Sequence, residues 1–368
     1  MRLALLAVST VLLLAQAPRF RPVFSAGPKP IGPYSPGLWA GDRLYVSGQG
    51  ARTADGQMAR DAEAQIRQTL DNVKGIVEAG GLTMDHVVFA HTYLADLSHY
   101  ELLNKIWNEY FTSAKPARAT VGVKVMPGGT PFEINAIAVR DRALVKPVAL
   151  PGSVSPVPLS PGVLTGDRLY LSGILGRDSS AGVIPATPEE QVEMVFTRMK
   201  GVLGAAGLDL RHVVALNVYT TAAMPDEVVS KVLSQHLPDR ERMAIAASRV
   251  EALPFGTNVA MHGVALRTLV PRERHGNCVS GGTTVFCGQF AADDYRTALT
   301  GLTGLLQRFG RSPAIVASYV FLDDLQEFAA MNKVYAEALG PPLPTRTTLQ
   351  PARTGSSARF RISVVAER

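Results

Sequence analysis

Arg118 heads one apolar run and Glu133 lies inside the next, within the stretch Lys115–Arg140, which is rich in apolar and small residues. Arginine presents a planar fork of donors that binds a carboxylate through two hydrogen bonds. A glutamate in an apolar run needs a hydrogen-bonded partner or a role in proton transfer, because an unpaired buried charge is unfavourable. The pair suggests a site that anchors a carboxylate and moves protons. The ordinary alternative is an arginine at a strand end on the surface and a glutamate satisfied by neighbouring backbone.

Two strands are predicted to position these residues. The apolar runs Ala119–Met126 and Phe132–Val139 are bounded by Pro116 and by the turn Pro127-Gly128-Gly129. Their β-branched and small residues favour a packed sheet. The arginine is therefore expected at the mouth of the first strand and the glutamate inside the second.

Separated motifs around this stretch resemble the RidA/YjgF family of enamine and imine deaminases. They are IGPYS at Ile31–Ser35, VSGQ at Val46–Gln49, the helix around Asn104 and the stretch Lys115–Arg140, and the resemblance covers about Lys29 to Arg140. It implies hydrolysis of imines and enamines, such as 2-iminobutyrate and 2-aminoacrylate, to 2-keto acids and ammonia, with no metal and no cofactor. In that chemistry the arginine grips the substrate carboxylate, and the glutamate positions the attacking water or transfers protons.

The resemblance also implies individual site residues. Arg118 and Glu133 are the implied catalytic pair. The implied substrate-binding residues are Tyr34, Ser47, Gly48, Asn104 and Thr120 in the first unit and Asn332 and Arg346 further along the chain. Many relatives have Cys at the position of Thr120, which leaves the substrate preference open.

Internal repeats organise the whole chain. GDRLYVSG at Gly41–Gly48 recurs as GDRLYLSG at Gly166–Gly173 and more faintly as GTTVFCGQ at Gly282–Gln289. Each copy is followed by a helical pattern ending in glycine, a strand, a second helix and a closing strand pair. The helical segments are Ala64–Gly81, Glu190–Gly207 and Tyr295–Gly310, and then Tyr100–Phe111, Glu227–His236 and Phe328–Leu339.

The predicted fold is α+β, with three tandem ββαβαββ RidA-like (chorismate-mutase-like) units at residues 24–143, 153–268 and 274–368. The linkers are expected at about Arg142–Pro156 and Thr268–His275. Because both helices of a unit lie on one face of its sheet, the other face needs cover. RidA-like proteins are homotrimers with clefts between subunits, so the resemblance implies a monomer built as a single-chain pseudo-trimer. Three independent beads would each expose an apolar sheet face.

The second and third units depart from the implied site. The second has Leu159, Ser230, Ile245 and Ala260 in place of Tyr34, Asn104, Arg118 and Glu133. The third keeps Gly288, Gln289, Asn332 and Arg346 but has Arg361 at the glutamate position, which predicts a doubly cationic cleft poor in acid. The resemblance implies that arginine and glutamate of one unit meet tyrosine and hairpin residues of its neighbour. At most one cleft, a hybrid, is therefore expected to be complete, and Tyr34 is expected near Arg346 or near the second unit.

Two other functions remain open. The chain is either a deaminase or a non-catalytic binder of small carboxylates, or scaffold, that retains Arg118 and Arg346 as anchors. The third alternative is a chorismate-cleaving relative, since such relatives also fuse units of this kind. A net charge of +6 that forms no Lys/Arg run argues against a nucleic-acid partner.

The first residues predict export. Met1–Ala17 has one arginine, an apolar stretch and the small residues Ala15-Gln16-Ala17, which is the layout of a signal peptide. The alternative is a buried N-terminal strand or helix. No later run reaches 18 apolar residues, so no membrane partner is expected after signal removal, and the predicted location is periplasmic or secreted.

Two cysteines and two histidines complete the inventory. Cys278 and Cys287 are a candidate disulfide in an exported protein. Aligning their hairpin with that of the first unit places Cys278 opposite Val285, so the thiols are predicted to be diagonal neighbours and the bridge stays open. His91 and His99 are expected on the surface or at the edge of the core.

Overall fold

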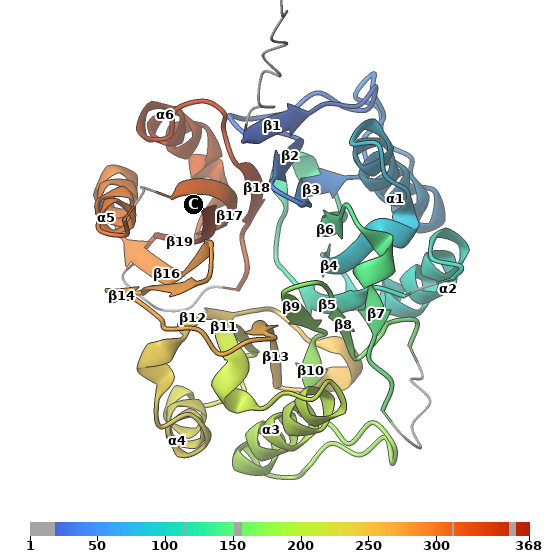
Figure 1. Ribbon diagram of the computed structural model, residues 1–368. Helices are drawn as coiled ribbons and strands as arrows, with labels where there is room; N and C mark the ends of the chain where they lie inside the picture. The colour runs from blue at the N-terminus through green and yellow to red at the C-terminus, as the bar shows by residue number, and fades with distance from the viewer. Residues whose placement is uncertain (1–18, 114, 151–156, 311–312, 353–357) are drawn as a thin grey trace, which may run out of the picture.

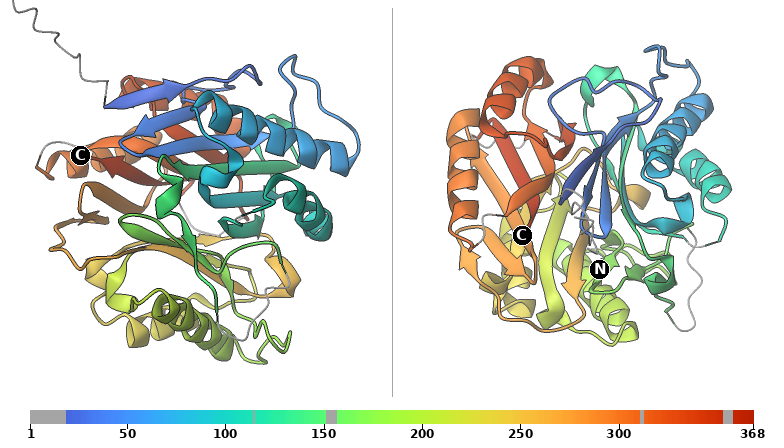
Figure 2. Two further views of the ribbon diagram at one scale, coloured as in Figure 1. Left: turned by 45° about the vertical axis from the view of Figure 1, so that its right-hand side comes forward. Right: turned by 45° about the horizontal axis from the view of Figure 1, so that its top comes forward.

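Three mixed sheets stand around a common centre, and a pair of helices covers the outer face of each (Figures 1 and 2). The computed structural model describes residues 19–113, 115–150, 157–310, 313–352 and 358–368. The expected signal peptide and part of the first expected linker lie outside these ranges. Among the described residues, no helix is both long enough and apolar enough to cross a membrane.

The first sheet has the strand order β1-β2-β3-β6-β4-β5. Helices α1 (Ala62–Ala79) and α2 (Tyr100–Tyr110) cover it. Its strands are β1 (Phe20–Val23), β2 (Gly37–Ala40), β3 (Arg43–Gly50), β4 (Val87–Leu94), β5 (Ala117–Gly122) and β6 (Phe132–Val139). Strand β4 lies between β5 and β6, so the strands of Arg118 and Glu133 are not neighbours.

Strand β5 ends at Gly122, not at Met126 as the apolar run predicts. The residues beyond it leave the sheet because they pair with the other two parts of the chain. Gly122 forms an isolated bridge with Ala252, and Val125 forms one with Gln350. The apolar run after Gly122 therefore serves contacts between sheets.

The second sheet has the order β12-β11-β13-β9-β8-β7, with β10 also paired to β13. Helices α3 (Pro188–Ala205) and α4 (Asp226–His236) cover it. Strand β7 lies in the expected first linker, so part of that linker forms a strand of the second sheet. The strands are β7 (Lys146–Pro147), β8 (Gly162–Leu164), β9 (Arg168–Leu171), β10 (Ile174–Leu175), β11 (Val213–Thr220), β12 (Ala244–Arg249) and β13 (Val259–Leu266).

The third sheet has the order β14-β15-β16-β19-β17-β18, which matches the first sheet strand for strand. Helices α5 (Tyr295–Gln307) and α6 (Phe328–Ala338) cover it. Its strands are β14 (Arg274–His275), β15 (Cys278–Gly281), β16 (Thr284–Ala292), β17 (Ala314–Leu322), β18 (Thr345–Leu349) and β19 (Phe360–Glu367).

The long first helix of each sheet follows the predicted pattern. The apolar residues of α1 recur at helical spacing and are buried against the sheet, and the Asp61 side chain accepts a hydrogen bond from Ala64 N at its start. Gly81 and Gly207 follow α1 and α3 with positive φ angles of 84° and 73°, as predicted. Gly310 lies beyond the end of α5 and is not such a cap.

The sheet faces without helices pack against one another. A single apolar cluster combines residues of all three sheets, among them Leu38, Phe89, Ile137, Val163, Tyr170, Val316 and Ala317. The three sheets are therefore not independent domains, because separating them would expose this apolar cluster to water.

The order of the contacts follows from the edge strands. Arg118 N on β5 donates to Ser172 Oγ of the second sheet at 2.8 Å, and Arg346 N on β18 donates to Ser47 Oγ of the first at 2.8 Å. Gln289 of the third sheet donates through Nε2 to Ser248 Oγ on β12 at 3.1 Å. We call these contacts the first–second, third–first and second–third seams.

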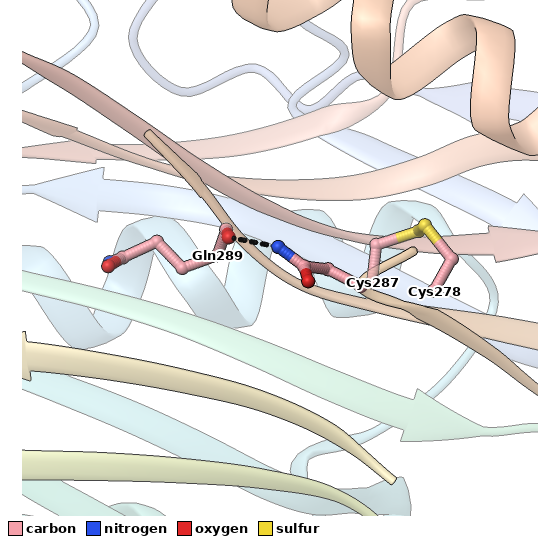
Figure 3. The surroundings of a disulfide bond; sticks show 4 residues. Cys278, Cys287 and Gln289 are labelled. Atoms are coloured by element: carbon pink, nitrogen blue, oxygen red, sulfur yellow. Dashed lines mark hydrogen bonds between the residues drawn. A yellow bond between two sulfur atoms is a disulfide. The ribbon is translucent and has the colours of Figure 1, made fainter. Parts of the chain in front are cut away.

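The hairpin of β15 and β16 carries a disulfide between Cys278 and Cys287 (Figure 3). The predicted register, with Cys278 opposite Val285, is wrong. The two-residue turn Gly282-Thr283 pairs Gly281 with Thr284, and this register places the two cysteines directly opposite each other. Asn277 Nδ2 donates to the carbonyl of Gln289 at 2.9 Å, and Gln289 lies close to the bridge in Figure 3.

Replacing both cysteines by alanine is expected to lower the free energy of unfolding by about 2–3 kcal/mol, because the bridge closes a loop of about ten residues in the unfolded chain. Urea unfolding of the oxidised protein and of the Cys278→Ala/Cys287→Ala variant measures this difference. A reductant should shift the wild-type midpoint and leave that of the variant unchanged. Equal midpoints for both oxidised proteins would contradict the expectation.

Candidate functional site

A buried arginine with free donors occupies the third–first seam. Arg346 is 3% exposed, and its Cζ lies 4.8 Å from the centre of the Tyr335 ring and 5.1 Å from that of Tyr34. Among the described residues, neither Arg346 Nη2 nor Asn332 Oδ1 has a hydrogen-bond partner. Burial lowers the pKa of Arg346 from its ordinary value, while the nearby Tyr335, Tyr34 and Glu133 act in the opposite direction. The guanidinium is therefore poised to bind an anion.

Gly32 allows this arginine to reach the first sheet. A Cβ at Gly32 would overlap Arg346 Nη2 and would lie 3.0 Å from Asn332 Oδ1. The glycine of the IGPYS motif thus leaves room for the polar tips of two residues that belong to the third sheet.

A buried carboxyl faces this arginine from the first sheet. Phe132 and Ile134 belong to the core under α1 and α2, so Glu133 between them points to the other face of the sheet. Glu133 is 6% exposed, and burial raises its pKa to about 8 despite the opposing charge of Arg346. The two side chains do not form an ion pair, since no charged atoms of theirs approach within 4.0 Å.

Tyr34 closes the same cleft. Its hydroxyl accepts a hydrogen bond from Ile31 N at 3.2 Å, and burial raises its pKa. The cleft has a volume of about 80 Å³, and its lining comes from the first and third sheets, including Lys29, Ile31, Tyr34, Gly48, Gln49, Arg52, Thr130, Glu133, Phe328, Arg346 and Thr348. A carboxylate anchor, a proton donor and an aromatic wall therefore meet at one place.

The predicted meeting of Arg118 with Glu133 is wrong. The Arg118 side chain points toward α2, where Nη2 donates to Asn104 Oδ1 and Cζ lies 4.8 Å from the centre of the Trp107 ring. Glu133 points to the opposite face of the same sheet. Because side chains alternate along strands, these two residues cannot share a cleft, and Arg346 takes the place expected for Arg118.

The other predicted binding residues divide between the two seams. Tyr34 and Gly48 line the cleft with Arg346, and Ser47 supports it by donating to the Ser35 carbonyl at 2.7 Å. Asn104 is bound to Arg118, and the Thr120 hydroxyl pairs with that of Thr92 at 2.7 Å. Neither of them belongs to the cleft of Glu133.

The first–second seam lacks a carboxyl. Ala260, at the glutamate position, lies in an apolar cluster. The ring of Phe255 packs on Tyr100 at 5.6 Å and beneath the Arg177 guanidinium at 4.2 Å. Arg118 is only 1% exposed under this aromatic cover. This seam retains an anchor without an acid.

The second–third seam lacks the arginine, and the predicted doubly cationic cleft is wrong. Ile245 pairs with Leu216 as Arg118 pairs with Ala90. Arg361 forms an ion pair with Asp323 at 2.5 Å and does not line the cleft of Arg346. The strand register also makes Gly288 the counterpart of Ser47, so this hairpin has no serine hydroxyl for the neighbouring edge strand.

Sequence reasoning missed one partnership, that of Arg346 with Glu133. The two residues are far apart in the sequence. A local pattern predicts which face of the sheet Glu133 occupies, but not which residue it meets there. Phe132 and Ile134 alternate with Glu133, which assigns the glutamate to the face without helices. Which edge strand that face meets depends on the order of the three sheets, and no motif encodes it.

Gly48 is expected to tolerate no side chain. A Cβ there would overlap the Glu133 carboxyl, so Gly48→Ala should displace that carboxyl while the fold persists. For the imine hydrolysis that the family resemblance implies, the expected result is a fall in turnover of at least tenfold. Gly301→Ala on α5 is the matched control, because nothing lies within 4 Å of its added Cβ. Circular dichroism checks the fold, and ammonia release from 2-iminobutyrate checks turnover. Full activity of Gly48→Ala would show that the carboxyl need not stay in place.

Comparisons with known proteins match two regions of the chain to one family. The family model described as Endoribonuclease L-PSP matches residues 24–140 and 153–267. A RutC family protein of Saccharolobus solfataricus is 40% identical over 114 residues, which cover 30% of this chain and 90% of that protein. Protein DfrA of Myxococcus xanthus is 41% identical over 116 residues, 30% of this chain and 88% of that protein. The crystal structure of E. coli TdcF with bound serine has 31% identity, covers 33% of this chain and 99% of that chain, and has a TM-score of 0.32.

Proposed function

Because this chain belongs to the endoribonuclease L-PSP family, the RidA/YjgF family, we propose that it hydrolyses 2-imino acids to 2-keto acids and ammonia in the third–first seam. The observation that carries the proposal is the cleft itself. Arg346, Glu133 and Tyr34 line one cavity. At the positions equivalent to Arg346 and Glu133, the first–second seam has Arg118 and Ala260 and the second–third seam has Ile245 and Arg361, so neither pairs an arginine with a glutamate there.

The third sheet is a third, diverged unit of the same family in this proposal. It lies beyond the two matched regions. Its support is the strand order, which repeats that of the first sheet, together with two helices in the same places in the chain order. The molecule is then a single-chain pseudo-trimer, and Arg346 supplies the anchor that a neighbouring subunit would otherwise provide.

Arg346 binds the substrate carboxylate. Its free Nη2 donor and its buried setting favour a planar anion, and the rings of Tyr34, Phe328 and Tyr335 hold the guanidinium in place. Binding by two parallel hydrogen bonds fixes both the position and the orientation of the substrate. The imine carbon then lies toward Glu133.

Glu133 transfers the protons. Its raised pKa keeps the carboxyl protonated at neutral pH, so it first donates a proton to the imine nitrogen. The resulting carboxylate accepts a proton from the water that adds to the imine carbon. Glu133, protonated again, donates its proton to the amino nitrogen of the tetrahedral adduct and takes up the hydroxyl proton as the C–N bond breaks, so ammonia leaves and the 2-keto acid remains. An enamine substrate takes the proton on carbon first and follows the same course.

Ammonia release from freshly generated 2-iminobutyrate tests the proposal. The expected rate exceeds the spontaneous hydrolysis rate measured without protein. Saturable binding of 2-keto acids without turnover would instead support a carboxylate binder, and consumption of chorismate would support a chorismate-cleaving enzyme. A rate equal to the spontaneous one ends the deaminase proposal.

The activity should fall as the pH rises through about 8. The pKa of Glu133 is raised, so the carboxyl is protonated below that value and ionised above it, and only the protonated form donates. The measurement is kcat/KM for 2-iminobutyrate from pH 6 to 10, after subtraction of the spontaneous rate. A roughly tenfold fall per pH unit above the pKa is expected. A rate that rises across this range would contradict the role as acid.

We also propose that the protein is exported, on the strength of the residue pattern of Met1–Ala17. Cell fractionation with an antibody tests this. Protein found wholly in the cytoplasmic fraction, with Met1 retained, would contradict it.

A further inference from the structure

The common centre of the three sheets is filled unevenly. Phe89 on β4, Ala215 on β11 and Ala317 on β17 occupy equivalent positions in the three sheets. The phenylalanine ring fills its share of the centre, whereas Ala215 lines a cavity of about 70 Å³, several times the roughly 10–15 Å³ that one water needs.

A belt of polar side chains surrounds this cavity. His91, Asn217 and Tyr319 occupy equivalent positions on β4, β11 and β17. His262 and Ser363 occupy equivalent positions on β13 and β19. Asn217 and Tyr319 are half-buried although β11 and β17 are inner strands of their sheets. Because neighbouring strands flank them on both sides, their exposed surface faces the cavity. A buried polar side chain on an otherwise apolar sheet face is unfavourable unless it has a hydrogen-bond partner.

Three polar atoms that line the cavity have no hydrogen-bond partner among the described residues: His91 Nε2, His262 Nε2 and Tyr170 Oη. His91, expected on the surface or at the edge of the core, is 1% exposed, while His262 and Tyr170 are 8% and 3% exposed. Unpartnered polar atoms at this depth are rare in folded proteins. They are available to bind a polar group of a molecule that enters the cavity.

The direction of one of these hydrogen bonds follows from its neighbours. Asn135 Nδ2 donates to Tyr93 Oη at 3.3 Å, so the Tyr93 hydroxyl is free to donate to His91 Nδ1 at 2.8 Å. Burial lowers the pKa of His91 well below its usual range, so the ring is neutral, and with the Tyr93 hydroxyl donating to Nδ1 we assign its one proton to Nε2. An N–H group therefore points into the cavity and requires an acceptor.

The charge around the cavity also favours an anion. Arg168 lines the cavity. Its Nη2 donates to Asp167 and to Thr284, and its Nη1 makes neither of these hydrogen bonds. No aspartate or glutamate is among the lining residues. Aromatic rings supply flat walls, since His262 stacks on Phe89 at 5.1 Å and on Tyr219 at 5.8 Å.

We propose that this cavity is a second binding site, separate from the cleft of Arg346, for a small aromatic carboxylate of the size of benzoate. The aromatic walls fit a flat ring, and the neighbouring donors Tyr170 Oη and Arg168 fit its carboxylate, while His91 Nε2 offers a further donor at another strand position. The site does not depend on the proposed deaminase activity, because none of these residues lines the cleft of Arg346.

Benzoate binding, measured by isothermal titration calorimetry, tests the proposal. The Arg346→Ala variant removes the anchor of the cleft and is expected to keep one benzoate site per chain. Ala215→Phe places in β11 the side chain that β4 carries at Phe89, so it should fill the cavity and raise the Kd at least tenfold. Tyr170→Phe removes one donor with little change of shape and should raise the Kd about three- to tenfold, whereas Tyr110→Phe on α2 is the matched control and should leave it unchanged.

Crystals soaked in benzoate should show the ring among Phe89, His262 and Tyr219. Ordered water alone at that place, or a benzoate affinity that Arg346→Ala abolishes and that both Ala215→Phe and Tyr170→Phe leave intact, would overturn the proposal. Benzamide, the neutral analogue, should bind at least tenfold more weakly than benzoate; equal affinities would overturn the assignment of a carboxylate. If Ala215→Phe does not fold, Tyr170→Phe and the soaked crystals decide.

Discussion

Replacing Arg346 by alanine is expected to reduce kcat/KM for 2-iminobutyrate by about 1,000-fold. The change removes a charge-assisted hydrogen-bond pair to the substrate carboxylate in a buried cleft, where such a pair contributes several kcal/mol. Part of the loss should appear in KM, because the anchor holds the substrate before reaction, and part in kcat, because it also orients the imine carbon. Steady-state kinetics of ammonia release measures both.

Arg118→Ala is the informative control for this variant. Arg118 occupies the same position on β5 that Arg346 occupies on β18, and each donates its backbone N–H to a serine hydroxyl of the neighbouring sheet. The cleft of Glu133 does not include Arg118, so its replacement should leave kcat/KM within about threefold of the wild type. If Arg118→Ala abolishes turnover while Arg346→Ala does not, the third–first seam is not the site.

Glu133→Gln is expected to lower kcat by about 10³-fold and to change KM little. Glutamine has nearly the same shape and keeps a polar tip, but it cannot release and recover a proton. The substrate carboxylate still binds Arg346, so the loss falls on the chemical step. Single-turnover measurements of 2-keto acid formation separate this step from product release.

A second readout shows that Glu133→Gln acts through the carboxyl. Burying the ionised form of Glu133 is unfavourable, which is why its pKa is raised from 4.5 to about 8. The stability linked to this group is present at low pH and is lost as the pH rises toward 8. The variant should therefore gain Tm over the wild type at pH 9 and not at pH 4, whereas the exposed Glu251→Gln should show no such gain. Retention of wild-type kcat by Glu133→Gln would remove the glutamate from the mechanism.

The sequence predicts much of the framework. The helices α2, α4 and α6 begin and end within a residue or so of the predicted ranges, because their apolar spacing and flanking residues define them locally. The glycines after α1 and α3 adopt the predicted left-handed conformation. Because both helices of each unit are predicted on one face of its sheet, the other face is predicted to need cover, and the apolar cluster at the centre confirms it.

The composition of the cleft depends on long-range order that local patterns do not contain. Arg118 and Glu133 are close in sequence, yet an intervening strand and the alternation of side chains direct them to opposite faces of one sheet. Arg346 and Glu133 meet because the last edge strand returns to the first sheet. The predicted pairing of Cys278 with Val285 is wrong for a local reason. The two-residue turn sets which residues of the hairpin face each other.

Carrying three sheets on one polypeptide changes how the seams relate to concentration and to mutation. Each edge strand finds its neighbour within the same chain, so the cleft of Arg346 assembles at any dilution and specific activity should not fall as the protein is diluted. A substitution in one chain also alters a single seam, whereas in a ring of identical subunits it alters every seam at once. In the proposed mechanism only one of the three interfaces takes part in the reaction. Of the other two, one is covered by the packed rings of Tyr100 and Phe255, and in the other Arg361 pairs with Asp323.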